Sequence, residues 1–187
     1  IEYFKGVTEW FDRINEYGKQ NNVIIEHYVI SSGLKEVIDG SVIREKFKEV
    51  YACEFHYDEN GVADWPKVSV NYTAKTQFLF RINKGVLKVY NDDDLNKFTP
   101  EEDRRIPFRN MIYIGDGLTD VPCMKLVKIN GGQSIAVYQP RKKFKVEELF
   151  KDKRVDFILP ANYSKNSEID KVVKTIIKKM AVVNELV

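Results

Sequence analysis

Two aspartates lie four residues apart in the segment MIYIGDGLTD, where an apolar run gives way to the start of a predicted helix. Asp116 stands between Gly115 and Gly117, which allow the backbone to turn and a ligand to approach closely. Asp120 falls in the first helical turn, where an isolated aspartate most often serves as an N-cap. Asp116 needs another explanation, because a carboxylate at the end of a buried strand requires a partner. A hard cation such as Mg²⁺, bound by oxygen atoms and water, would satisfy both carboxylates.

Two further groups of residues could contact an anion. Ser31, Ser32 and Gly33 follow the apolar run 23–30, where a hydroxyl and free backbone N–H groups can bind a phosphate. A Ser-Ser-Gly sequence before a helix is more commonly an ordinary turn or cap. Lys75 begins another predicted helix, a position that the helix dipole disfavours for a cation unless an anion lies nearby. An ordinary exposed lysine is the alternative interpretation.

The elements that must position these residues alternate along the chain. Apolar periodicity predicts helices over about 7–20, 74–85, from Asp120 onward, over 143–152 and over 169–180. Short apolar runs predict strands over 23–30, 110–115, 134–138 and 155–159, and residues 51–71 form a predicted β-hairpin with its turn at Asn60-Gly61. This order predicts an α/β fold whose sheet is mainly parallel and covered by helices on both faces. Ligands bind such sheets at the carboxyl ends of the strands.

Composition allows one sizeable core and disfavours several classes of protein. The chain has 187 residues, of which 43% are hydrophobic. Its net charge of +2 gives no overall field that would favour a nucleic acid or a membrane surface as partner. Every apolar run is shorter than the ~20 residues of a transmembrane helix. Cys53 and Cys123 form no paired motif, which favours reduced thiols and a cytoplasmic location, and His27 and His56 lack metal-site spacing and are interpreted as packing or edge residues.

Three features follow one another along the chain: a serine after a strand, a lysine at a helix start and the segment GDGLTD. Together they resemble the last three of the four motifs of the haloacid dehalogenase superfamily. The likeness is closest to members similar to phosphoserine phosphatase, whose hairpin between the serine and lysine motifs is also similar. It covers roughly residues 20–160, and GDGLTD is its most specific part. The resemblance implies a three-layer Rossmann-like core with a mainly parallel sheet, a β-hairpin and the remnant of a helical cap.

The resemblance also implies an activity. In that superfamily a phosphoryl group moves to an aspartate and is then hydrolysed, so we expect a Mg²⁺-dependent phosphatase that acts on a small phosphorylated metabolite. By the match, Ser31 would bind phosphoryl oxygens together with the N–H groups near Ser32 and Gly33. Lys75 would neutralise charge on the phosphate and on the nucleophile, and Thr119 would face the phosphate.

The same match assigns the metal. Asp116 would bind Mg²⁺ directly, and Asp120 would support the metal through water or orient its neighbours. With Ser31 and Lys75, these two aspartates complete the set of expected catalytic residues.

The first motif of the superfamily, an apolar strand followed by Asp-x-Asp, does not precede Ser31 in this sequence. That motif supplies the nucleophile. The pair Asp92-x-Asp94 has the right spacing, but it follows Lys75 and lies in the polar segment 91–105, so it is interpreted as a solvated loop.

The resemblance places the missing strand centrally, between the strands that precede Ser31 and Asp116. We therefore expect residues 1–187 to be one core domain and the C-terminal part of a longer chain, with residues 1–18 as the end of a cap and a lead-in helix. The alternative, since the nucleophile is absent, is a metal- or phosphate-binding interaction domain without turnover. Dehalogenation, another chemistry of the same superfamily, is a third hypothesis.

Overall fold

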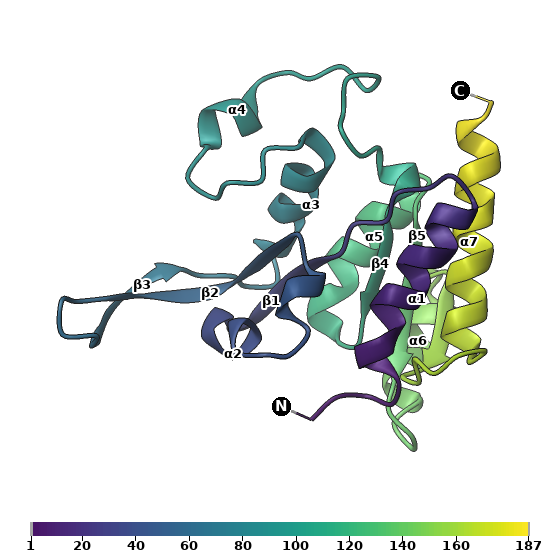
Figure 1. The fold of residues 1–187 in the computed structure, drawn as a ribbon, viewed down its shortest axis with the longest axis horizontal. Helices are drawn as coiled ribbons and strands as arrows, with labels where there is room; N and C mark the ends of the chain where they lie inside the picture. Colours follow the sequence, from purple (N-terminus) through teal and green to yellow (C-terminus); the bar gives the residue numbers. More distant parts are fainter. Residues whose placement is uncertain (1, 187) are drawn as a thin grey trace.

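The computed structural model describes residues 2–186, which form an α/β fold (Figure 1). The helices are α1 (Val7–Gln20), α2 (Lys35–Asp39), α3 (Lys75–Lys84), α4 (Asp92–Asn96), α5 (Val121–Ile129), α6 (Phe144–Lys151) and α7 (Glu168–Asn184). The strands are β1 (Tyr28–Leu34), β2 (Glu49–Tyr57), β3 (Ala63–Val68), β4 (Ile112–Gly115), β5 (Gln133–Tyr138) and β6 (Phe157–Pro160). The predicted α/β class is confirmed, and none of the described helices is both long and apolar enough to cross a membrane.

Within the described residues the strands form two three-stranded sheets. β1 pairs in parallel with β2, and β2 pairs antiparallel with β3 in the predicted hairpin, whose turn contains Gly61 at φ 77°. β4, β5 and β6 are all parallel. The expectation of mainly parallel pairing is therefore confirmed. The expected single sheet is not observed, because β1 and β4 belong to two separate sheets.

Helices cover both faces of the β4–β5–β6 sheet (Figure 1). Side chains of α3, α5 and α6 form one core cluster, which includes Met124 and Val127. Side chains of α1 and α7 form the other, which includes Ile14 and Ile177. Successive residues of β5 alternate between the two clusters, because neighbouring side chains of a strand point to opposite faces. Strand β4, which precedes Asp116, therefore lies between two apolar core clusters.

The first and last helices run side by side in the same direction. Arg13 Nε lies 2.9 Å from Asp170 Oδ1, and one turn further along, Lys174 Nζ lies 5.4 Å from the centre of the Tyr17 ring. Asp170 N–H is in turn bonded to the side chain of Ser167, which caps the start of α7. Residues 7–20 are therefore packed into the core through α7.

The strand predicted over 23–30 begins later than expected. β1 starts at Tyr28, which pairs with Glu49, and it continues to Leu34. Residues 23–27 stay outside both sheets because β2 begins only at Glu49, although Lys48 N–H still donates to His27 O at 2.8 Å. Residues 31–33 consequently lie inside the end of the strand and not after it. The pairing register shifts between Ile30 and Leu34, so residues 31–33 leave the regular ladder.

A buried arginine holds the chain that leaves α3. The side chain of Arg81 is 1% exposed, and its guanidinium donates to the carbonyl oxygens of Lys88 at 2.8 Å, Val89 at 2.9 Å and Asn91 at 3.2 Å. It also pairs with Asp92, the first residue of α4. The start of the polar segment 91–105 is thereby tied to the core.

Candidate functional site

A buried ion pair joins two of the predicted motifs. Lys75, the first residue of α3, places Nζ 2.7 Å from Oδ1 of Asp120, and these side chains are 6% and 10% exposed. Thr119 Oγ1 lies 3.4 Å from the same Nζ. The carboxylate balances the lysine charge that the helix dipole alone would disfavour. The alternative interpretation of Lys75 as an exposed lysine is therefore wrong.

Tyr113 is a member of this cluster that sequence analysis missed. Its hydroxyl donates to Asp120 Oδ1 at 2.9 Å, so this one oxygen accepts from both a phenol and an ammonium group. Burial, followed by the negative charge of Asp120, raises the pKa of Tyr113 well above its usual range. The phenol therefore stays protonated and remains a donor. Its position two residues before Gly115, on the same face of β4, was the available sequence signal.

The first glycine of the Gly-Asp-Gly segment makes room for the carboxylate. A Cβ atom at Gly115 would lie 2.6 Å from Asp120 Oδ2 and 2.7 Å from its carboxyl carbon, closer than van der Waals contact permits. Asp120 occupies the N-cap position of α5 but makes no side-chain cap hydrogen bond. The interpretation of this aspartate as only an N-cap is wrong, because its side chain turns back over β4.

Asp116 lies at the carboxyl end of β4 and is exposed. Within residues 2–186 its carboxylate has no hydrogen-bond or ion-pair partner. The Asp116 charge also affects Tyr163, which follows β6. Burial, with a smaller contribution from the negative charge of Asp116, raises the pKa of Tyr163 to about 12. Asp116 and Asp120 thus differ sharply, one carboxylate open to solvent and the other neutralised by a lysine.

These two carboxylates define what metal the site could hold. The described part of the chain contains no group of three or more acidic, histidine or cysteine side chains arranged as metal ligands. Mg²⁺ is commonly held by one or two carboxylates, with water and substrate oxygens completing its coordination. The donor set of Asp116 and Asp120 therefore fits Mg²⁺ and does not fit a metal enclosed by protein ligands alone.

The serine motif lies on the other sheet. Ser31 Oγ accepts the Gly33 N–H at 3.0 Å, and Ser32 and Gly33 are exposed. In the part of the chain that the structure describes, Ser31 makes no hydrogen bond to Lys75 or to either aspartate of the site. The structure thus brings Lys75, Thr119 and Asp120 into contact and leaves the serine motif apart, on the strand that faces β4 across a cavity.

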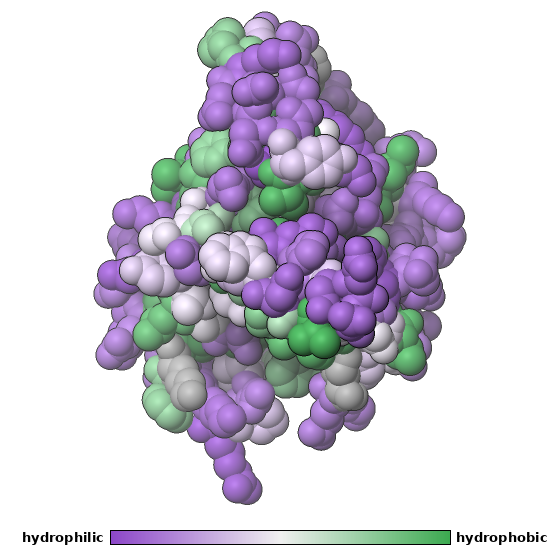
Figure 2. All heavy atoms as spheres, turned by 90° about the vertical axis from the view of Figure 1, so that its left-hand side faces the viewer, coloured by the Kyte–Doolittle hydropathy of each residue, from purple (hydrophilic) through white to green (hydrophobic). Residues whose placement is uncertain are grey.

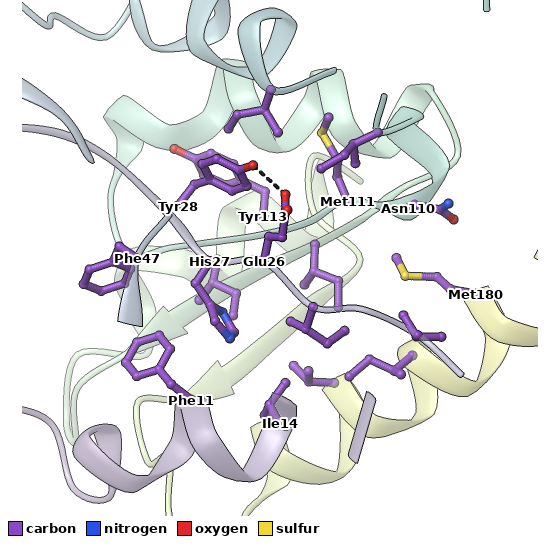
Figure 3. Close-up of a pocket in the computed structure, with 18 of the residues that line it drawn as sticks. Phe11, Ile14, Glu26, His27, Tyr28, Phe47, Asn110, Met111, Tyr113 and Met180 are labelled. Atoms are coloured by element: carbon purple, nitrogen blue, oxygen red, sulfur yellow. Dashed lines mark hydrogen bonds between the residues drawn. The ribbon is translucent and has the colours of Figure 1, made fainter. Parts of the chain in front are cut away.

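That cavity has a volume of about 950 Å³ and is lined by both β1 and β4. Figure 3 shows Phe11 and Ile14 from α1 and Met180 from α7 on one side of it, with Tyr28 and Tyr113 across from them. The Tyr113 ring therefore borders the cavity while its hydroxyl contacts Asp120.

A polar group lies at the start of β1. Glu26 accepts a hydrogen bond from the Tyr28 hydroxyl at 2.6 Å and pairs with Arg105 and Lys48. Burial alone would raise the pKa of Glu26, but the hydrogen bonds from Arg105, Lys48 and Tyr28 outweigh it and lower the pKa to about 2. Glu26 is therefore ionised at neutral pH and ties the segment before β1 to the segment before β4.

The fold and the cluster together define an α/β protein with a buried lysine–aspartate pair and an exposed aspartate at the carboxyl end of a parallel strand. No protein-family model matches the chain. A protein of Borreliella burgdorferi, described as an uncharacterized protein, is 30% identical to it over 189 residues. The match covers 90% of this chain and 64% of that protein, so the chain spans slightly less than two thirds of the relative's length.

Proposed function

We propose that this chain is the larger part of a Mg²⁺-dependent phosphatase of the haloacid dehalogenase superfamily. Its substrate is a small phosphomonoester, and its nucleophile is an aspartate elsewhere in the full-length polypeptide. The observation that carries the proposal is the buried contact between Lys75 and Asp120, 45 positions apart, with the exposed Asp116 four residues before Asp120. A lysine, a threonine hydroxyl and two aspartates at the carboxyl end of a parallel strand suit phosphoryl transfer.

In this proposal each side chain has a defined task. The Lys75 ammonium has three N–H groups. Asp120 and Thr119 accept hydrogen bonds from two of them, and the third donates to a phosphoryl oxygen of the substrate. Asp120, oriented by Tyr113, holds the lysine in place. Asp116 and Asp120 are the residues that would hold Mg²⁺, which when bound supplies positive charge beside the transferring group. Ser31 and the neighbouring N–H groups bind the remaining phosphoryl oxygens.

The reaction proceeds in two steps. A carboxylate oxygen of the nucleophile bonds to phosphorus while the ester P–O bond breaks, and the leaving oxygen takes up a proton and departs as the alcohol. Water then attacks the aspartyl-phosphate, which releases inorganic phosphate and restores the carboxylate. The core in which these steps occur is, in this proposal, the three-layer Rossmann-like arrangement of the superfamily, with the β2–β3 hairpin beside the serine motif.

A second candidate is a phosphate- or metal-binding domain without turnover. It is favoured by the neutralised state of Asp120, whose Oδ1 already accepts from Lys75 and Tyr113. In this case the full-length protein binds Mg²⁺ or phosphate and releases no alcohol from phosphate esters.

The deciding experiment measures p-nitrophenyl phosphate hydrolysis by the full-length protein with Mg²⁺ and with EDTA. We expect Mg²⁺-dependent turnover and a loss of about 10²- to 10³-fold in kcat for Asp116→Ala, the scale seen when one charge-stabilising group is removed. Asp93→Ala is the matched control, because Asp93 is an exposed aspartate of α4. Full activity in Asp116→Ala, or no hydrolysis across a broad panel of phosphate esters, contradicts the proposal.

A further inference from the structure

The two carboxylate oxygens of Asp120 have different surroundings. Oδ1 accepts hydrogen bonds from Lys75 Nζ at 2.7 Å and from the Tyr113 hydroxyl at 2.9 Å. Oδ2 accepts no hydrogen bond from residues 2–186. The side chain retains 10% exposure, so the carboxylate is not sealed from solvent. One oxygen is thus committed to the protein, and the other is available to a ligand.

The available oxygen, Oδ2, lies beside the turn that carries Asp116. A Cβ atom built on Gly115 would lie 2.6 Å from Oδ2, and one built on Gly117 would lie 4.0 Å from it. These two glycines flank Asp116 in the sequence. The free oxygen of Asp120 and the exposed carboxylate of Asp116 therefore belong to the same turn, where both can act on one cation.

The Tyr113 hydroxyl determines which oxygen is left free. The lysine ammonium is a compact charge on a flexible stem, and it can pair with either oxygen of a carboxylate. The phenol is more selective, because Tyr113 sits in β4, where its backbone pairs with Ser134 of β5, and it is only 9% exposed. A ring held in this way offers its O–H to one side of the carboxylate. It therefore selects Oδ1 of Asp120 and leaves Oδ2 to the turn.

The Tyr113 hydroxyl lies in a setting that offers few other acceptors. Tyr113 belongs to the same apolar cluster as Met124 and Val127, and the fully buried thiol of Cys123 neighbours the hydroxyl. Asp120 accepts the one hydrogen bond that the hydroxyl donates within the described residues. An O–H group that is buried without an acceptor is costly, so the bond to Asp120 is maintained.

A second phenol–carboxylate pair shows what burial adds. Tyr57 donates to Glu36 Oε1 at 3.0 Å, but Tyr57 is 45% exposed and lies at the end of β2, in the hairpin. The hairpin lies on the face shown in Figure 2, which is mostly hydrophilic, with apolar side chains in scattered spots. Water competes for both groups there, so this bond does not hold the carboxylate in one orientation.

We propose that Tyr113 is a positioning residue for Mg²⁺. Together with Lys75 it holds Oδ1 of Asp120, so that Oδ2 is presented to Mg²⁺ or to one of its bound waters, beside Asp116. The proposal rests on the Mg²⁺ site of the proposed function and deepens it, because it names a residue that sets the metal affinity without touching the metal. Partners that orient metal ligands in this way are worth about 10- to 100-fold in metal affinity or activity.

The first test is a calorimetric titration of MgCl₂ into the full-length protein after its metal has been removed with EDTA. Tyr113→Phe keeps the ring and removes only the O–H, so that the Asp120 carboxylate can turn between two orientations. We expect the Kd for Mg²⁺ to rise by about tenfold or more in this variant, and a rise of less than about fivefold overturns the proposal.

Tyr51→Phe is the matched control for this titration. Tyr51 is 1% exposed, belongs to the same core cluster as Tyr113 and donates its hydroxyl to Leu87 O at 3.0 Å. The control variant therefore loses a buried hydrogen bond of the same kind, whose acceptor lies outside the candidate site. Its Kd for Mg²⁺ should stay within about twofold of the wild-type value. An equal rise in both variants would indicate a general loosening of the core and overturns the role of Tyr113.

The second test separates metal binding from substrate binding during p-nitrophenyl phosphate hydrolysis. In Tyr113→Phe the Mg²⁺ concentration that gives the half-maximal rate should rise about tenfold, while KM at saturating Mg²⁺ should stay within about twofold of the wild-type value. A raised KM with an unchanged Mg²⁺ requirement overturns the proposal. In that case a loosened substrate pocket, and not a misplaced metal ligand, would explain the variant.

The outcomes distinguish this proposal from the proposed function. Mg²⁺ binding that weakens in Tyr113→Phe, in a protein that hydrolyses no phosphate ester, retains the role of Tyr113 and rejects only the phosphatase. Turnover together with an unchanged Kd for Mg²⁺ in Tyr113→Phe rejects only the role of Tyr113. Absence of Mg²⁺ binding to the wild-type protein overturns both.

Discussion

At the scale of single residues, the candidate site depends on a carboxylate that is nearly removed from water. The side chain of Asp120 is 10% exposed, Lys75 balances its charge, and the Tyr113 hydroxyl donates a hydrogen bond to it. Removing one partner of a buried ion pair leaves an uncompensated charge, which is far more costly than replacing both partners by apolar groups.

This asymmetry gives a stability prediction. Lys75→Met should lower the free energy of unfolding by about 3–5 kcal/mol, whereas Lys75→Met combined with Asp120→Leu should recover much of the loss. Urea denaturation measures both changes. The control is Lys97→Met, because Lys97 forms an exposed pair with Asp94 and such pairs contribute about 1 kcal/mol or less. Equal losses in Lys75→Met and Lys97→Met would show that the lysine is not buried in solution.

Sequence patterns identified part of this cluster. The family resemblance predicts Lys75, Thr119 and Asp120 as site residues, and the structure brings these side chains into contact. Tyr113 was not expected, because an aromatic residue in an apolar strand has no signature that separates a core ring from a hydrogen-bond donor. The Tyr113 hydroxyl becomes a hydrogen-bond partner of Asp120 only because the Asp120 side chain packs back over β4.

At the scale of the elements, the close approach of α5 to β4 depends on the absence of one side chain. Asp120 precedes the first residue of α5, and its carboxylate lies directly over Gly115. The strand–turn–helix unit therefore positions the carboxylate through backbone contact as well as through hydrogen bonds.

Gly115→Ala tests this contact. The added methyl would displace the Asp120 carboxylate from Lys75 and should destabilise the protein by about 1–3 kcal/mol, as overpacking does in other cores. Gly117→Ala is the matched control, because its Cβ would meet nothing closer than 3.8 Å and its φ of −137° is ordinary extended backbone. Thermal unfolding of both variants provides the measurement; equal effects would contradict the assigned packing.

The elements themselves were predictable where local signals agreed. The helices predicted over 7–20, 74–85 and 169–180 follow from apolar periodicity and are confirmed as α1, α3 and α7. The prediction that this strand starts at residue 23 is wrong, because a strand begins where a partner strand is available, and β2 starts opposite Tyr28. Pairing between distant segments is not encoded in the local pattern of residues 23–27.

At the scale of the whole molecule, two apolar cores meet at the cavity between the sheets. His27 borders this cavity and packs its ring edge-on against Phe11, with ring centres 4.9 Å apart. Burial lowers the pKa of His27 to about 4, despite an opposing contribution from Asp12. The division into two sheets could not be read from strand composition, because each strand alone is compatible with a continuous sheet.

The lowered pKa predicts how stability depends on pH. Between about pH 6.5 and pH 4 the unfolded chain binds a proton at His27 and the folded chain does not, so stability falls as the pH falls. The loss should reach about 3 kcal/mol by pH 4. Glu26, whose pKa is lowered to about 2, adds a further loss below about pH 4.5.

Urea denaturation at several pH values measures this dependence. His27→Phe should flatten the slope between pH 4 and 6.5 while leaving the slope below pH 4 in place. His56→Gln is the control, because His56 is exposed on the hairpin beside Asp64. An unchanged slope in His27→Phe would show that another group controls acid unfolding.

The buried Arg81 determines where the chain can be lengthened for labelling. Its guanidinium donates to the carbonyl oxygens of Lys88, Val89 and Asn91 beyond α3, so one residue added or removed between 86 and 91 would take an acceptor away from a cation that water cannot reach. The tip of the hairpin is the opposite case: residues 59–61 are exposed, and a Cβ at Gly61 would meet nothing within 4 Å. An epitope tag or a fluorophore therefore belongs at the hairpin tip, where it leaves the core intact.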